Sequence, residues 1–103
     1  MIFRACAAII IVLAPQIASA QTTFGDYDCG QWFSANRRTS AQAWVMGYLS
    51  GMNQAYAGTS KEILHKVNSA DQLILWIDNY CKVNPLKNVS DAAIALHAEL
   101  ARK

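Results

Sequence analysis

The helical character of this chain is clearest in SADQLILWIDNYCKVNP, residues 69–85. Ser69, with Gln72 three residues later, resembles a capping box, which predicts that a helix begins here. Apolar side chains then recur at helical spacing as far as Cys81, and Pro85 cannot continue a helix. The side chains of this apolar face include Leu73, Ile74, Trp76, Ile77 and Tyr80. The stretch therefore predicts one amphipathic helix that places a cysteine near its C-terminal end.

A longer helix is predicted upstream, from about Thr39 to Ala57. Thr39 and Gln42 are spaced as a capping box, and Gly58 is a natural helix terminator. Two stripes run along this helix. One stripe is a broad apolar face, formed by Ala41, Trp44, Val45, Tyr48, Leu49, Met52 and Tyr56. The other is a row of small residues at every fourth position, formed by Ala43, Gly47, Gly51 and Ala55.

The small row has two interpretations, because a helix surface without side chains lets another helix approach closely. It favours packing inside the domain over a contact between subunits, such as a homodimer. A domain of this size buries only part of its apolar surface, so some of the large side chains should stay near the surface. We therefore predict a self-association or client-binding surface, formed by Trp44, Tyr48, Leu49, Met52, Tyr56, Gly47 and Gly51.

Shorter elements complete an all-α fold of about four helices. Cys29, Trp32 and Phe33 follow helical spacing, so a short helix should point all three inward. Thr59 and Glu62 are expected to cap a short helix in the polar connection. A last helix should begin at the N-cap Ser90, with Val89 packed on Ile94 and with a hydrogen-bonded His97 on its inner face. Residues 21–28 resemble a loose leader, and no stretch alternates convincingly as a strand.

The first 20 residues have the pattern of a cleavable signal peptide. Arg4 precedes an apolar run over residues 5–14, and Ala18-Ser19-Ala20 matches the small residues that signal peptidase accepts. The run is shorter than the roughly 20 residues of a membrane-spanning helix. We therefore expect residues 21–103 to form one exported domain without a stable membrane anchor.

Cleavage would leave two cysteines, Cys29 and Cys81, which are 52 positions apart. A pair of cysteines in a small exported domain most simply forms a disulfide. A redox or metal-binding pair would normally lie closer in sequence, as in Cys-x-x-Cys. The pair is therefore expected to be structural.

The residues that carry chemistry are few. His65 and His97 are the only histidines, and with oxidised thiols they are too few for a metal site. No nucleophile motif accompanies them, so the sequence predicts no enzyme, no cofactor and no metal site. Basic and acidic residues are interspersed, with no pattern of nucleic-acid binding. Residues 21–103 hold eight Lys and Arg against seven Asp and Glu, so their net charge would climb to about +10 in acid.

A resemblance adds a possible family. Residues 77–89, IDNYCKVNPLKNV, resemble the second-cysteine motif of the HdeA/HdeB family of periplasmic acid-stress chaperones. Asp28-Cys29 with Trp32-Phe33 is similar to the first-cysteine motif of that family. Ala43-Trp44 with Met46 resembles the start of its long second helix. The resemblance implies a compact four-helix fold with a Cys29–Cys81 disulfide, a periplasmic location and a dimer that loosens in acid to hold unfolding client proteins.

One segment departs from that family. Residues 47–51, GYLSG, look more like the Gly-Tyr-x-x-Gly segment of related small exported helical proteins, some of which are immunity proteins against secreted toxins. Two functions are therefore carried forward. The first is a chaperone-like protein that binds many clients under acid stress, and the alternative is a binding or immunity protein with one specific partner.

Overall fold

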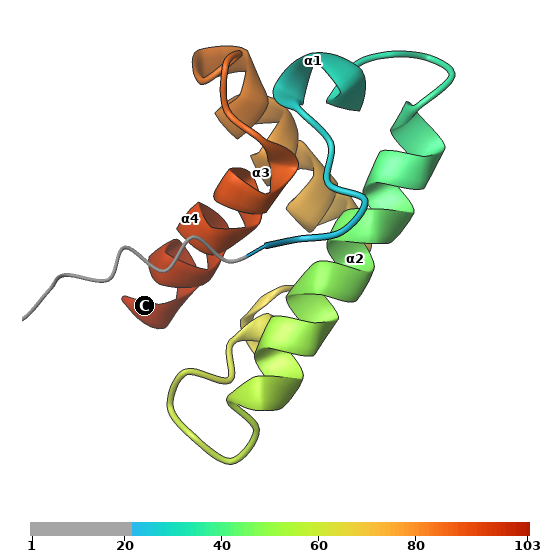
Figure 1. Cartoon of the computed structure of the whole chain (residues 1–103). Helices are drawn as coiled ribbons and strands as arrows, with labels where there is room; N and C mark the ends of the chain where they lie inside the picture. Colours follow the sequence, from blue (N-terminus) through green and yellow to red (C-terminus); the bar gives the residue numbers. More distant parts are fainter. Residues whose placement is uncertain (1–21) are drawn as a thin grey trace, which may run out of the picture.

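The computed structural model describes residues 22–103, which form four α-helices and one 3₁₀ turn (Figure 1). The elements are α1 (Cys29–Trp32), α2 (Arg38–Ala55), η1 (Leu64–Lys66), α3 (Ala70–Val83) and α4 (Val89–Ala101). No strand occurs among residues 22–103, so the predicted all-α fold is confirmed. The predicted signal peptide, residues 1–20, lies outside the described residues.

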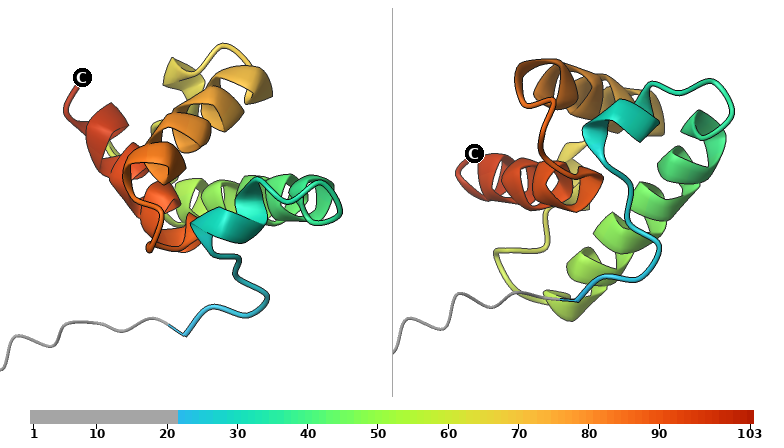
Figure 2. Two further views of the ribbon diagram at one scale, coloured as in Figure 1. Left: turned by 90° about the horizontal axis from the view of Figure 1, so that it is seen from above. Right: turned by 45° about the horizontal axis from the view of Figure 1, so that its top comes forward.

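The helices surround a single apolar core. α4 packs against both α2 and α3, and the short α1 lies across one end, where it contacts α2 and α3 (Figures 1 and 2). Each long helix contributes one buried stripe to this core. The largest fully buried side chains are Trp32, Leu49, Ile63, Ile77, Val45 and Val89.

The disulfide joins Cys29 at the start of α1 to Cys81 near the end of α3. The two Cα atoms are 5.0 Å apart, within the usual range for a disulfide, and both residues are buried in the core. The predicted pairing is confirmed, and the bond closes a loop that contains all of α2.

The segment before α1 is tied down, so the prediction of a loose leader was wrong. The Val89 amide donates to the Tyr27 carbonyl at 2.7 Å, and the Cys29 amide donates to the Lys87 carbonyl at 2.9 Å. These bonds flank an isolated antiparallel bridge between Asp28 and Asn88. The sequence reasoning missed this pairing because it joins residues 60 positions apart without a strand pattern on either side.

The predicted helix starts are right in part. Ser69 accepts a hydrogen bond from the Gln72 amide at the start of α3, as predicted, although the Gln72 side chain reaches the Asn68 amide. The predicted Thr39 cap was wrong, because α2 already begins at Arg38 and its N-cap, Arg37, makes no side-chain bond.

The last helix begins earlier than predicted. Its N-cap is Asn88, which forms a capping box with Asp91, so Ser90 is not the cap. The predicted staple of Val89 on Ile94 was also wrong, because Val89 is the first residue of α4 and does not precede its N-cap. The predicted cap at Thr59 is absent as well, because Ile63 precedes η1 and no side chain caps that turn.

The burial of the aromatic side chains also agrees with the prediction only in part. Trp32 is fully buried, as predicted, but Phe33 is 43 % exposed and does not point into the core. Trp76 is only partly buried and stacks on Tyr80, with ring centroids 5.7 Å apart. The helical spacing of Phe33 was misleading because α1 ends at Trp32, one residue before it.

Candidate functional site

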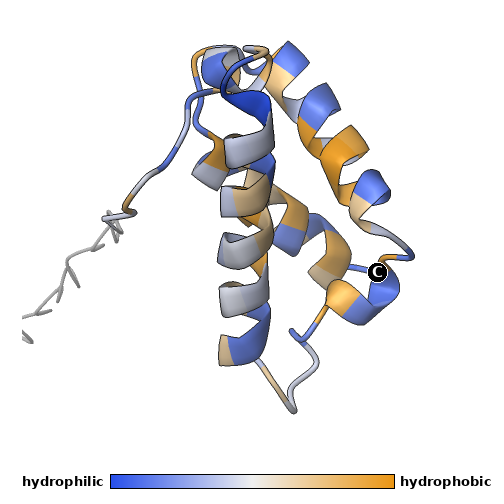
Figure 3. Ribbon diagram, turned by 90° about the vertical axis from the view of Figure 1, so that its right-hand side faces the viewer, coloured by the Kyte–Doolittle hydropathy of each residue, from blue (hydrophilic) through white to orange (hydrophobic). Residues whose placement is uncertain are grey.

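The outer side of α2 carries most of the predicted surface. Ala41, Val45 and Leu49 face the core and are fully buried, whereas Trp44, Tyr48, Met52 and Tyr56 lie at the boundary and are partly exposed. Figure 3 shows α2 in front with a pale ribbon along much of its length, because Gly, Ser, Trp and Tyr have intermediate hydropathy. Leu49 is thus separated from the rest of the predicted surface while the protein is folded.

The small row is open to solvent. Ala43, Gly47, Gly51 and Ala55 are all exposed. A methyl group built on Gly47 or Gly51 would meet no atom within 4 Å. The favoured interpretation, packing inside the domain, was therefore wrong for these glycines, and the contact between subunits stays a prediction.

The aromatic part of this surface is held by the segment before α1. The Trp44 indole N–H donates to the Phe24 carbonyl at 2.7 Å, and the Trp44 ring stacks on Tyr48 with centroids 5.0 Å apart. Gly25 adopts φ 72° directly against the indole, where a Cβ atom would lie 3.4 Å from the ring. A shallow hollow of about 520 Å³ opens beside these residues, between the segment at Thr22 and the exposed Gly47.

Asp26 fastens that segment to α4. Its carboxylate accepts hydrogen bonds from the Ser90 hydroxyl and from the Ser90 amide, the latter at 3.2 Å. Burial, Asp26 and Asp91 together raise the pKa of the nearby Tyr48 hydroxyl. Asp26 was predicted to lie in the loose leader, because its partner is 64 positions away and leaves no local signal.

Asp78 joins three helices. From α3 it accepts a hydrogen bond from the Trp32 indole at 2.6 Å, and it pairs with the Arg38 guanidinium of α2 at 3.0 Å. Arg38 also lies over the Trp32 ring, 5.3 Å from its centroid, and donates to the Trp32 carbonyl. The Asp78 side chain is 19 % exposed, so a single carboxylate near the core connects α3 to α1 and to α2.

Glu62 and Asn53 attach the polar connection, the segment between α2 and α3 that contains η1, to α2. The Asn53 side-chain oxygen accepts from the Ile63 and Leu64 amides, and its amide group donates to Glu62 at 2.6 Å. Glu62 also pairs with His65. The hydrogen bond from Asn53, followed by that from His65, lowers the pKa of the Glu62 carboxyl.

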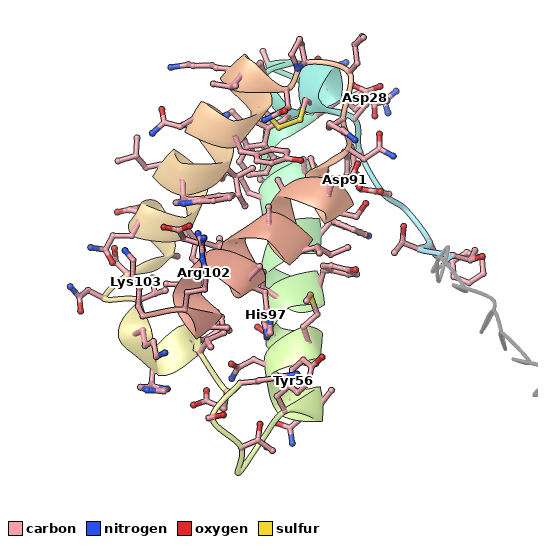
Figure 4. The ribbon with its side chains drawn as sticks, turned by 90° about the vertical axis from the view of Figure 1, so that its left-hand side faces the viewer. Asp28, Tyr56, Asp91, His97, Arg102 and Lys103 are labelled. Carbon is pink, nitrogen blue, oxygen red and sulfur yellow. A yellow bond between two sulfur atoms is a disulfide. The ribbon has the colours of Figure 1, made fainter. Side chains whose placement is uncertain are left out.

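Both histidines make structural contacts. His65 is exposed, as predicted, and pairs with Glu62. His97 is partly exposed rather than a core residue; it contacts the Lys61 carbonyl at 3.2 Å and packs on the Tyr56 ring, 5.1 Å between centroids (Figure 4). Within residues 22–103 no group of three or more His, Cys, Asp or Glu side chains is placed to hold a metal ion.

Two comparisons with known proteins and one with protein families complete this description. No family model, no curated protein and no solved structure matches the chain. In the part of the chain that the structure describes, no helix has the length and apolar character needed to cross a membrane.

Proposed function

We propose that this protein is a periplasmic chaperone-like protein that opens in acid and then binds unfolding client proteins. The observation that carries the proposal is the placement of carboxylates between elements. Asp78 connects three helices, Asp26 connects the segment before α1 to α4, and Glu62 connects the polar connection to α2. Asp78 and Glu62 hold α2 to the rest of the fold, and protonation of Glu62 would weaken its contact with α2.

The sign of the effect follows from linkage. The folded-state pKa of Glu62 lies below its ordinary value, so its contacts stabilise the fold above the unfolded pKa. That contribution is lost as the pH falls through the folded pKa. Loss of all seven carboxylate charges would leave a strongly cationic chain, whose self-repulsion also favours opening.

The disulfide determines which parts separate. Because it links α1 to α3, those two helices stay together in acid, whereas α2 is held to them only by non-covalent contacts. Separation of α2 would expose its buried stripe, Val45 and Leu49, beside the partly exposed Trp44 and Tyr48. Leu49 is buried in the folded protein, so it could contact client proteins only after α2 separates.

The proposal is tested by suppression of client aggregation between about pH 2 and pH 7, the range in which carboxylates and histidines titrate. We expect suppression only on the acid side. The Asp78→Asn variant should begin to suppress aggregation at a higher pH, because it lacks the charge that pairs with Arg38. Asp71→Asn is the matched control, since Asp71 is exposed in the first turn of the same helix.

The alternative function has a distinct outcome. A protein that neutralises one secreted toxin should capture a single stoichiometric partner at neutral pH and should suppress no aggregation in acid. Weak association with many proteins only after acidification supports the chaperone.

A further inference from the structure

A second groove lies where η1, α3 and the end of α4 meet. It has a volume of about 370 Å³, and its lining includes Leu73, Trp76 and Leu100. Figure 4 shows Lys103 at this end of α4, next to the chain that enters α3. The volume of the groove falls in the range of sites that bind small ligands or a few side chains.

Two large apolar side chains of the lining are accessible at the surface of this groove. Leu75 is 60 % exposed although it lies in the middle of α3, and Trp76 beside it is only partly buried. Trp76 is held in place by stacking on Tyr80. A rigid aromatic ring beside an exposed leucine is suited to receive apolar side chains from a partner.

The titratable side chains of the groove are basic. Lys66 and Lys103 line it, and no carboxylate side chain does. The Lys66 ammonium donates to the Leu100 carbonyl at 2.9 Å and to Lys103 O at 2.7 Å. An ammonium has three donors, so Lys66 is fixed at the edge of the groove with one donor left over.

We propose that this groove binds a peptide segment in which apolar side chains alternate with acidic ones. The apolar side chains would occupy the surface of Leu75 and Trp76, and a carboxylate would lie next to Lys66. The exposed amide side chain of Asn79, also in the lining, supplies a hydrogen-bonding group for a peptide backbone. The groove is formed in the folded protein, so this binding goes beyond the proposed acid-dependent function and does not require it.

The test is a titration followed by NMR at neutral pH, with the full exported protein and two capped peptides. The sequences are LLELE and LLKLK, which share their apolar residues and differ in charge. We expect the acidic peptide to bind at least about fivefold more tightly, the size of an exposed charge effect. Its shifts should centre on Leu73, Leu75 and the Trp76 indole.

Two variants at one exposed position separate charge from contact. Leu75→Glu should weaken binding of LLELE at least about fivefold more than Leu75→Lys does, since both lose the leucine and differ only in sign. Equal binding of the two peptides, equal effects of the two variants, or no shift in the groove would overturn the proposal. Decanoate is the third probe: shifts with decanoate but none with LLELE would make this a fatty-acid site and would also overturn it.

Failure of this groove proposal can be told apart from failure of the proposed chaperone function. The peptide titration is carried out at neutral pH and observes α3, whereas the chaperone function is measured in acid and depends on α2.

Discussion

Asp78 is a single side chain through which α3 bonds to two other helices, α1 and α2. It accepts from Trp32 and pairs with Arg38, so its removal leaves an indole donor and a guanidinium without their partner. Hydrogen bonds to charged groups contribute about 1.5–3 kcal/mol. This contribution is moderated here because Arg38 is 32 % exposed and partly screened by water.

We therefore expect Asp78→Asn to lower the free energy of unfolding at neutral pH by about 1–2 kcal/mol. Urea denaturation at neutral pH measures this, with Asp71→Asn as the control. A loss in the control as large as that in Asp78→Asn would show that helix charge, and not the contact, is responsible.

Glu62 gives a second prediction from its lowered pKa. Glu62→Gln should melt at a lower temperature than wild type at neutral pH, because glutamine lacks the charged carboxylate that Asn53 and His65 contact. Since the folded pKa lies below the unfolded value, the two proteins should converge once the pH falls below the folded pKa of Glu62. Thermal melts by circular dichroism at several pH values check this, and a difference that persists in strong acid would contradict it.

At the scale of single residues, local signals were predictable and distant partners were not. Ser69 lies within three residues of the amide it caps, so sequence spacing was enough to predict it. Asp26 and Asp78 bond to residues 64 and 46 positions away, and nothing in their neighbourhood distinguishes them from solvated carboxylates. These carboxylate contacts between elements therefore emerge only from the fold.

The element that matters most is α2, which has a buried stripe, an aromatic boundary and an exposed small row. Its core stripe, Ala41, Val45 and Leu49, belongs to the broad apolar face that helical periodicity predicted, but the prediction of Leu49 as a surface residue was wrong for the folded protein. The exposure of Gly47 and Gly51 did not, because periodicity shows which residues share a face but not whether a neighbour covers it. Helix α2 ends at Ala55, two residues before the predicted end, and Gly58 follows at φ 79°.

The open surroundings of Gly51 make its effect on stability predictable. Gly51→Ala should raise the free energy of unfolding by about 0.5–1 kcal/mol, because alanine restricts the unfolded chain and meets no neighbour. Urea denaturation measures the change. A destabilised variant would mean that another helix does approach this row.

The Gly51→Leu variant tests the predicted contact between subunits. It should remain folded, since the position is open in the single chain. If two copies pair through the small row, sedimentation at neutral pH should show a dimer for wild type and for Gly51→Ala, and a monomer for Gly51→Leu. The same association state for all three would exclude the row from any such interface.

At the scale of the molecule, the disulfide compensates for a small core. It closes a loop of 52 positions, which corresponds to about 4 kcal/mol in the chain-entropy model. We expect the double variant Cys29→Ala, Cys81→Ala to lose a comparable amount, or to be unfolded at neutral pH. Denaturation of this variant measures the loss; a change below about 1 kcal/mol would mean that the helices alone determine the stability.

The fold class and the disulfide were within reach of the sequence, because both depend on periodicity and on the two cysteines of residues 21–103. The packing of α4 against both α2 and α3, and the pairing of the segment before α1 with residues 87–89, were not. These arrangements bring distant polar groups together, and they create both the carboxylate contacts between elements and the groove beside Lys66.

The central claim is that acid releases α2 while the disulfide keeps α1 and α3 together. Amide hydrogen exchange, corrected for the intrinsic rate at each pH, tests it most directly. Between about pH 7 and pH 3, protection should fall sharply at Val45 and Leu49 and should persist at Ile77 and Cys81. Equal protection of α2 at both pH values, or its loss in α2 and α3 together, would contradict the account.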